Sequence, residues 1–313
     1  MKALFILILS IFFAFFIACS DIFTPAGGDV EPNNVVPDTN WFWRCVAGEC
    51  IISTPEELAG LSLLVRRGRN MAGKVIVLGS DISFNTRNRS ANSAKFRWTP
   101  IGINEDTSFS GVFDGRGHIV SGIYLYSANN HQGFFGWIDG GAVVRNVGLE
   151  NLHIDGSGRH IGGLVGTNRL SSIQNSFTKG TVSGNFNYTG GLVGYNCGGR
   201  IENSFSHARV SGDSDVGGLV GANLGLPSSI VNSYSFGQAS GNKNVGGLVG
   251  HNAGATIANS YFNREASQRN DEENGIGKTA SEMRQDSTFV GWDFANTWRI
   301  GNNYPELRIF FPE

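Results

Sequence analysis

Apolar positions in this chain recur in short blocks, not at helical spacing. The block Gly-Gly-Leu-Val-Gly-x-Asn at 162–168 returns at 190–196, 217–223 and 246–252. A second block, Ile-x-Asn-Ser followed by Phe or Tyr, comes after each copy, and a third block in most copies ends in Ser-Gly. The second glycines of the four copies lie 28, 27 and 29 residues apart, which identifies an internal repeat.

Each repeat contains three short apolar or β-branched runs separated by Gly, Asn and Ser. The glycine density and the missing 3.6-residue period exclude a helix. Three strands and three corners per repeat predict an all-β fold, a single-stranded parallel β-helix (β-solenoid) with about 28 residues per turn. A β-propeller is the main alternative, although its blades usually have four strands and 40 or more residues.

Stacking of the turns places equivalent residues in columns. It predicts buried columns made of Ile173, Ile201, Ile230 and Ile257, and of Phe177, Phe205, Tyr234 and Tyr261. Strand alternation puts a first set of asparagines on the same side as these columns, where their amides form a ladder: Asn175, Asn203, Asn232 and Asn259. A second set follows the Gly-Leu-Val-Gly block, where the chain turns: Asn168, Asn196, Asn223 and Asn252. We interpret both as structural ladders, with ligand binding as the alternative.

Both ends of a solenoid need a cover, because open strand edges aggregate. Thr54-Pro55-Glu56-Glu57 predicts a helix over 55–67 that Gly68 ends. Thr279 to Glu282 forms a capping box before an aromatic cluster over 289–298. We therefore divide the folded part into an N-terminal cap (41–108), the solenoid (109–268) and a C-terminal cap (269–313).

The N-terminus predicts export and anchoring. Lys2 precedes an apolar run over 3–18, which ends at Ala18-Cys19-Ser20 and is typical of a lipoprotein signal peptide (1–18) with lipidation at Cys19. Residues 19–40 have the composition of a flexible tether. Ser20 beside the cysteine favours the outer membrane. An ordinary secretory signal is the alternative.

Charge and cysteines narrow the function. Only 16% of the 313 residues are charged, against roughly 25% in typical soluble domains, and the formal net charge is −2. Neither value indicates nucleic-acid binding. Cys45 and Cys50 are close enough for a local disulfide, whereas a metal site would need a second pair. We expect no cofactor and no metal.

The repeat resembles the GLUG motif, on the strength of Gly-Gly-Leu-Val-Gly-x-Asn followed by Ile-x-Asn-Ser and an aromatic residue. The flanks are similar too: Trp98 to Gly102, Phe109 to Gly115, and Tyr304 to Leu307. This resemblance implies a bacterial surface or adhesin-like protein, similar to the non-catalytic region of immunoglobulin A metallopeptidases. The His-Glu-x-x-His zinc helix of those enzymes does not occur in this sequence.

Acidic residues of the repeats do not fall into register, so we expect no catalytic residues. The predicted function is a lipid-anchored, non-enzymatic envelope protein whose solenoid binds a glycan or a host or cell-surface protein. A polysaccharide lyase or glycosidase is the alternative, with Asp114 and His118 as a conceivable acid–base pair. Asp271 to Asn274 is interpreted as an exposed acidic loop, not a calcium site.

Overall fold

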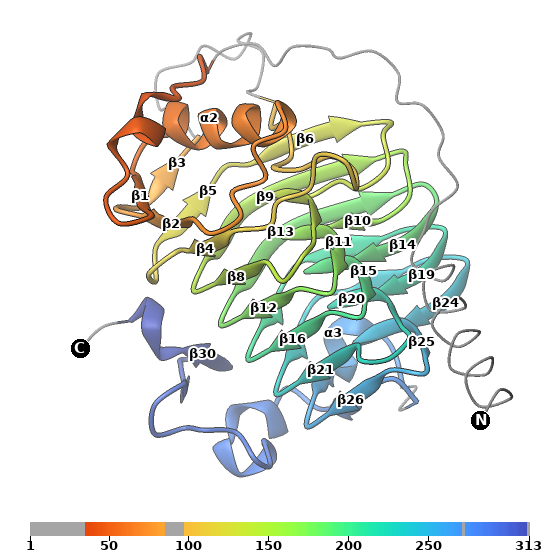
Figure 1. The fold of residues 1–313 in the computed structure, drawn as a ribbon. Helices are drawn as coiled ribbons and strands as arrows, with labels where there is room; N and C mark the ends of the chain where they lie inside the picture. The colour runs from red at the N-terminus through yellow and green to blue at the C-terminus, as the bar shows by residue number, and fades with distance from the viewer. Residues whose placement is uncertain (1–34, 85–96, 271–272, 312–313) are drawn as a thin grey trace, which may run out of the picture.

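The chain coils into a parallel β-solenoid, which confirms the fold class (Figure 1). The computed structural model describes residues 35–84, 97–270 and 273–311. Most strands pair in parallel with their counterparts in the adjacent turns, about 28 residues away. The pairing begins before residue 109, because strands of the predicted N-terminal cap already join the sheets.

Four parallel sheets, A to D, run along the coil in the described residues. Sheet A consists of β1 (Glu49–Ile52), β2 (Val75–Leu78), β4 (Val112–Asp114), β8 (Val143–Arg145), β12 (Ser172–Gln174), β16 (Arg200–Glu202), β21 (Ser229–Val231) and β26 (Thr256–Ala258). Sheet B consists of β3 (Ile82–Ser83), β5 (Ile119–Ser121), β6 (Tyr124–Ser127), β9 (Gly148–Gly156), β13 (Phe177–Gly184), β17 (Phe205–Ser206), β18 (Arg209–Ser211), β22 (Tyr234–Ser235), β23 (Ala239–Ser240), β27 (Tyr261–Asn263) and β28 (Ile276–Lys278).

Sheet C consists of β7 (Phe135–Ile138), β11 (Val165–Arg169), β15 (Val193–Cys197), β20 (Val220–Leu224) and β25 (Val249–Ala253). Sheet D consists of β10 (Ile161–Gly162), β14 (Asn187–Gly190), β19 (Ser214–Gly217) and β24 (Lys243–Gly246). Sheet D gives these turns a fourth strand, whereas the sequence predicted three strands per turn. Its strands are two to four residues long and end at the Gly-Gly pair, so each leaves almost no apolar run in the sequence.

The core lies inside the coil and is built from stacked identical residues. Leu164, Leu192, Leu219 and Leu248 are all fully buried, as are Val165, Val193, Val220 and Val249. The glycine pair between sheets D and C allows this packing. A Cβ atom on Gly191 would collide with the carbonyl oxygen of Gly218 in the next turn, so no other residue fits there without a shift.

The two predicted columns of the second block are both present and in register. Their sides differ from the prediction. Ile173 faces the main core, whereas Phe177 belongs to a second cluster outside sheet B. The reason is Asn175, whose φ of 46° puts it in the left-handed region and breaks strand alternation at the corner between sheets A and B.

The N-terminal end is covered as predicted. Helix α2 (Pro55–Arg66) is capped by Thr54, whose side chain accepts a hydrogen bond from the Glu57 amide, and Gly68 follows with a φ of 85°. Its residues Leu58, Leu61 and Val65 are buried in the core beside the first turn. The short η1 (Asn40–Arg44) adds the buried Trp41.

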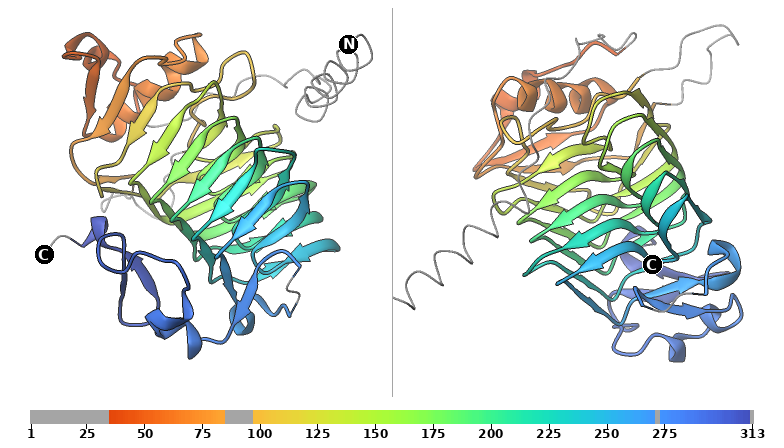
Figure 2. Two further views of the ribbon diagram at one scale, coloured as in Figure 1. Left: turned by 60° about the horizontal axis from the view of Figure 1, so that its bottom comes forward. Right: turned by 90° about the vertical axis from the view of Figure 1, so that its right-hand side faces the viewer.

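The C-terminal segment corrects the predicted end cap. Strand β28 pairs with β27 and extends sheet B, but in the described residues no further strand follows β24, β25 and β26. Residues 279–311, here called the strap, run back along the outer side of sheet B (Figure 2). The strap comprises η2 (Glu282–Arg284), η3 (Asp286–Thr288), β29 (Trp298–Ile300), β30 (Pro305–Leu307) and η4 (Arg308–Phe310), and α3 (Arg264–Ser267) lies before β28.

The strap is held by the outward aromatic column. Phe289 and Trp292 pack on Tyr261, Trp298 packs on Phe205, and Phe310 packs on Phe177. These large rings point away from the coil, and only an added layer can remove them from water. The predicted capping box is present: Thr279 Oγ1 accepts from the Glu282 amide, and the Glu282 carboxylate accepts from the Thr279 amide. It opens only one turn of 3₁₀ helix.

Candidate functional site

The asparagine column at the corner between sheets C and A is a continuous amide ladder. Asn168 donates to Asn196 at 2.7 Å, Asn196 donates to Asn223 at 2.7 Å, and Asn223 donates to Asn252 at 2.8 Å. Asn196 also donates to the carbonyl of Gly199 at 2.9 Å. The first three side chains are fully buried. Their polar groups therefore serve the corner and are closed to a ligand.

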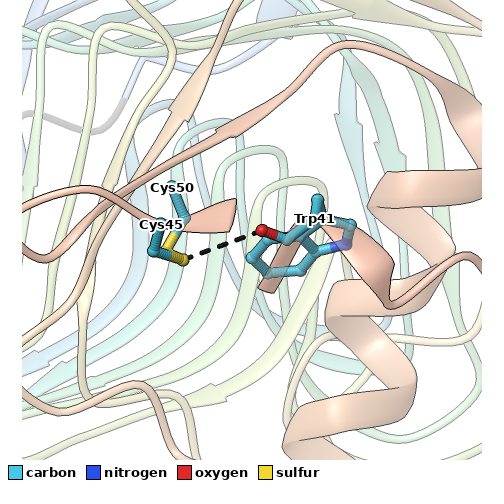
Figure 3. Close-up of a disulfide and its surroundings, with 3 residues drawn as sticks. All are labelled: Trp41, Cys45 and Cys50. Atoms are coloured by element: carbon cyan, nitrogen blue, oxygen red, sulfur yellow. Dashed lines mark hydrogen bonds between the residues drawn. A yellow bond between two sulfur atoms is a disulfide. The ribbon is translucent and has the colours of Figure 1, made fainter. Parts of the chain in front are cut away.

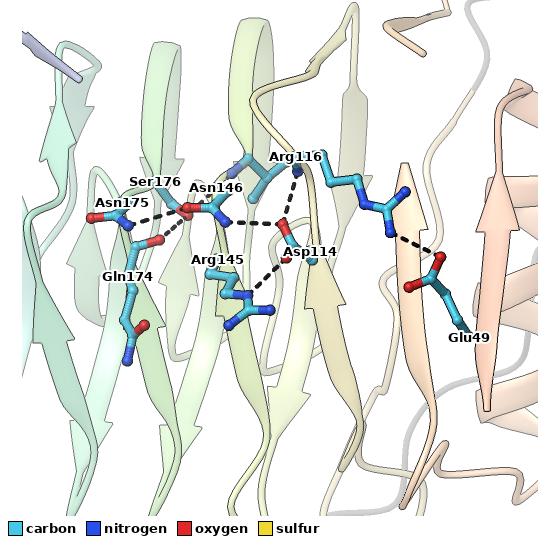
Figure 4. A network of polar contacts seen from close by, with 9 residues as sticks. Glu49, Asp114, Arg116, Arg145, Asn146, Gln174, Asn175 and Ser176 are labelled. Atoms are coloured by element: carbon cyan, nitrogen blue, oxygen red, sulfur yellow. Dashed lines mark hydrogen bonds and ion pairs between the residues drawn. The ribbon is translucent and has the colours of Figure 1, made fainter. Parts of the chain in front are cut away.

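The second asparagine column lies at the corner between sheets A and B, where Asn175, Asn203, Asn232 and Asn259 adopt φ values of 45–48°. Figure 4 shows an amide contact along this column, in which the Asn175 side chain donates to the Asn146 side-chain oxygen at 3.1 Å. The predicted ladder among Asn175, Asn203, Asn232 and Asn259 is therefore not formed in the described residues, and the single amide contact goes to Asn146 in the preceding turn. The main role of these residues is the left-handed turn, which Asn tolerates better than other non-glycine residues.

A buried serine ladder at the same corner was not predicted. The amide of Ser176 donates to Ser204 Oγ, that of Ser204 to Ser233 Oγ, and that of Ser233 to Ser260 Oγ, each at 3.2 Å. Each hydroxyl in turn donates to the carbonyl two residues before it, at 2.7–2.8 Å. The repeated Ser after Asn was the available sequence signal.

Asp114 and His118 do not form the acid–base pair considered from the sequence. Asp114 accepts hydrogen bonds from Arg145 at 2.9 Å, the Asn146 amide at 3.0 Å and the Arg116 backbone at 2.9 Å (Figure 4). Burial raises the pKa of Asp114, but these hydrogen bonds and the Arg145 charge outweigh it and leave the pKa lowered. His118 contacts Asp81 instead, at 3.1 Å. Asp114 is therefore an ionised structural carboxylate, unsuited to donating a proton.

Two histidines are buried against the outer side of sheet C. His131 and His160 both contact Thr167 Oγ1, at 2.8 and 2.9 Å, and their rings lie 4.8 Å apart. Burial lowers the pKa of His131 to about 4. Burial holds the pKa of His160 well below its usual value, and repulsion from a protonated His131 and from Arg159 adds to this effect. Both are neutral at physiological pH and form part of an aromatic stack.

A third buried histidine ties the coil to the strap. The His207 Nε2 atom lies 2.8 Å from the Tyr234 hydroxyl, which donates to the carbonyl of Pro305 in the strap at 2.6 Å. Since the hydroxyl proton is used there, Nε2 is the donor and carries the ring proton. Burial, followed by the Lys179 charge, lowers the pKa of His207 to about 3.

Cys45 and Cys50 form a disulfide in the N-terminal cap, with Cα atoms 4.4 Å apart (Figure 3). The Cys45 sulfur lies 3.9 Å from the carbonyl of Trp41, so the bridge links η1 to β1. The signal peptide, Cys19 and most of the tether lie outside the described residues, as does the start of the acidic loop at 271–272.

A metal site or a catalytic groove would require suitable side chains among residues 35–84, 97–270 and 273–311, the part of the chain that the structure describes. No group of three His, Cys, Asp or Glu side chains able to hold a metal ion occurs there. A shallow depression lies at the corner between sheets C and A; the residues that line it are Gly141, Ala142, Leu170, Ser171, Ser172, Gly198, Arg200, Pro227 and Ser229. Its lining contains no carboxylate, whereas glycoside cleavage uses a pair of them.

One side of sheet B stays open beyond the strap. It comprises β6, the second halves of β9 and β13, and β18 and β23, whose alternate residues Leu125, Ile154, Val182, Val210 and Ala239 are buried. The residues between them point outward: Tyr124, Tyr126, His153, Asp155, Thr181, Ser183, Arg209, Ser211 and Ser240. We call this surface the open face. Its outward residues are polar and partly aromatic.

Known proteins are similar to this chain in sequence motif and in fold. Residues 241–265 match the family model of the GLUG motif. A Bacteroides ovatus protein described as an immunoglobulin A1 protease has a similar fold, with a TM-score of 0.65, 21% identity, and coverage of 83% of this chain and 92% of that one. The class is therefore a parallel β-solenoid with stacked polar ladders. The chain contains a GLUG motif, and the matched segment lies in a coil of similar repeats.

Two curated relatives are also similar. Halomucin of Haloquadratum walsbyi is 37% identical over 82 residues, 26% of this chain. An Evansella cellulosilytica protein described as a Gly-rich membrane protein is 35% identical over 173 residues, 54% of this chain. The matches cover only 1% and 14% of those proteins. Among the described helices, none combines the length and the apolar character that crossing a bilayer requires.

Proposed function

We propose that this protein is a non-enzymatic, lipid-anchored component of the cell envelope whose solenoid is a binding module. One contrast carries the proposal. Two side chains suited to acid–base chemistry, Asp114 and His207, are held in structural contacts with Arg145 and Tyr234. The open face, in contrast, leaves polar and aromatic side chains in contact with solvent. The names of the relatives, halomucin and a Gly-rich membrane protein, support this role.

The anchor is proposed from the sequence ending at Cys19, and the names of the relatives support an envelope or surface location. The proposed site is the outer membrane, because Ser20 follows the cysteine. A single acyl chain binds a membrane only weakly, and stable attachment needs a second one. A lipidated N-terminal cysteine carries several acyl chains and therefore meets this requirement.

Lipidation is tested with Cys19→Ala, using Ser20→Ala as the matched control. Cells are labelled with a fatty-acid analogue and separated into membrane and soluble fractions. We expect Cys19→Ala to lose the label and leave the membrane fraction, while Ser20→Ala keeps both. Unchanged membrane retention of Cys19→Ala would refute the anchor.

The proposed partners are a glycan or a host or cell-surface protein, and nucleic acid is not among them. A carbohydrate-active enzyme is the competing function, because one fold can host both binding modules and enzymes. A panel of envelope and host glycans incubated with the purified chain separates the two. Binding without new reducing ends supports the module, and product formation would replace it with the enzyme.

A further inference from the structure

We infer that the open face binds an extended acidic polysaccharide, with carboxylates of uronic-acid type. This inference rests on the proposed function as a binding module and names its ligand class. The face has five turns in register, from Tyr126 through Asp155, Ser183 and Ser211 to Ser240. With about 4.8 Å between turns, it extends for about 19 Å.

The periodicity of the face suits a linear sugar polymer. The first four turns each offer two outward side chains and the fifth offers one, and the distance between turns is close to the length of one sugar residue in an extended glycan. Ser183 and Ser211 hydroxyls lie 2.8 Å apart, so the middle of the face is a row of hydroxyl groups. His153 bonds to the Thr181 hydroxyl at 2.8 Å and extends a parallel row. Such rows can exchange hydrogen bonds with sugar hydroxyls.

Aromatic rings stand at one end of the face. Tyr126 is 54% exposed, and the Arg97 guanidinium lies 5.5 Å from its ring centre. Tyr124 and His153 are stacked with their rings 5.0 Å apart and 5° from parallel. Tyrosine is enriched at binding interfaces because its ring is apolar and its hydroxyl is polar, and a flat ring accommodates the apolar face of a sugar.

Charge selects an acidic polymer over a neutral one. Arg209 is exposed on the face, and its side chain makes no hydrogen bond or ion pair with any described residue. Arg97 lies at the aromatic end, and Arg269 reaches the Ala239 carbonyl at the other end. Asp155 is the single acid among the outward residues of this face. The face thus has one arginine and one aspartate, and the two arginines at its ends bring the local count to three arginines against Asp155 on a chain of net charge −2. Arg binds carboxylates well.

The test measures binding of the full chain, purified in mild detergent, to polygalacturonate by calorimetric titration. Dextran is the neutral control, and single-stranded DNA is the control for a polyanion without uronic acid. We expect binding to polygalacturonate that weakens as salt rises, with much weaker binding to both controls. Equal binding of dextran or of DNA would overturn the inference.

Variants assign the binding to the face. We expect Arg209→Gln to weaken polygalacturonate binding about tenfold, the effect of losing 1.4 kcal/mol. Tyr126→Ala should weaken it by a similar factor. The matched control is Arg200→Gln, an exposed arginine of the same turn on sheet A, where it pairs with Glu202. Equal losses in Arg200→Gln and Arg209→Gln would contradict the assignment, even if the polymer binds.

The outcome separates this inference from the proposed function. Absent polygalacturonate binding, together with membrane retention that depends on Cys19, rejects the ligand and leaves the anchored module in place. Specific binding followed by shortening of the polymer supports the ligand class and rejects the non-enzymatic function.

Discussion

The buried amide ladder predicts a large and position-dependent loss of stability. Asn196 takes part in three hydrogen bonds, with Asn168 at 2.7 Å, Asn223 at 2.7 Å and the Gly199 carbonyl at 2.9 Å. Asn196→Ala leaves these three groups without a partner in a corner closed to water. Each unsatisfied buried group costs about 1–3 kcal/mol, so three of them should lower the free energy of unfolding by about 3 kcal/mol or more.

Asn252→Ala is the matched control at the end of the same ladder. Its side chain is only half-buried, accepts from Asn223 and donates to the Ala255 carbonyl at 3.2 Å. Water can replace both contacts, so the expected loss is about 1 kcal/mol. Both variants are measured by urea unfolding, with equal m-values required. A loss below 1 kcal/mol for Asn196→Ala, or equal losses in the two variants, would refute the ladder as a stabilising element.

Three further predictions concern stability. The pKa of His207 is about 3 in the folded chain and roughly 6.5 in the unfolded chain. The stabilisation by the buried neutral ring is therefore complete above pH 6.5 and is lost as pH falls. Between pH 6.5 and 5 the free energy of unfolding should decrease by about 2 kcal/mol. Urea unfolding at both pH values should show this loss reduced in His207→Gln, and an unchanged pH dependence would contradict it. Gly191→Ala should cost about 3 kcal/mol, because its Cβ meets the Gly218 carbonyl; thermal melting near wild type would exclude that close approach. Cys45→Ser, which opens the loop to Cys50, should destabilise the chain by about 2 kcal/mol, and reduction of the wild type should have the same effect on calorimetric unfolding; a stability unaffected by reduction would count against the bridge.

The stacking of the turns could be predicted from the sequence, because the spacing of the repeats gives the register in which their strands pair. Residues separated by 27 to 29 positions pair as Asn168 with Asn196 and Ile173 with Ile201, as their spacing predicted. The turn length, the parallel pairing and both buried columns follow from that register. Local signals were equally informative where capping chemistry is strong, as at Thr54 of helix α2.

Other features depended on backbone conformation that residue type alone does not specify. The left-handed turn at Asn175 sends Phe177 to the outside of sheet B, and strand alternation predicted the opposite. The position of the strap depends on this turn, because its aromatic residues pack on the outward rings of sheet B. From the sequence alone, the same aromatic residues could cover either the end of the solenoid or its side. The open face likewise depends on where the strap stops, which is a matter of tertiary packing.

Self-stacking of the repeats is tested most directly by spin labels on the open face. Ser183 and Ser211 are 28 residues apart in the sequence and pair directly in adjacent turns. Labels at these positions should show strong dipolar broadening. A pair at Ser183 and Arg200, which is closer in sequence but lies on different sheets, should give narrow spectra, as should the parent chain treated with the same label. Narrow spectra for Ser183 with Ser211 would contradict the solenoid.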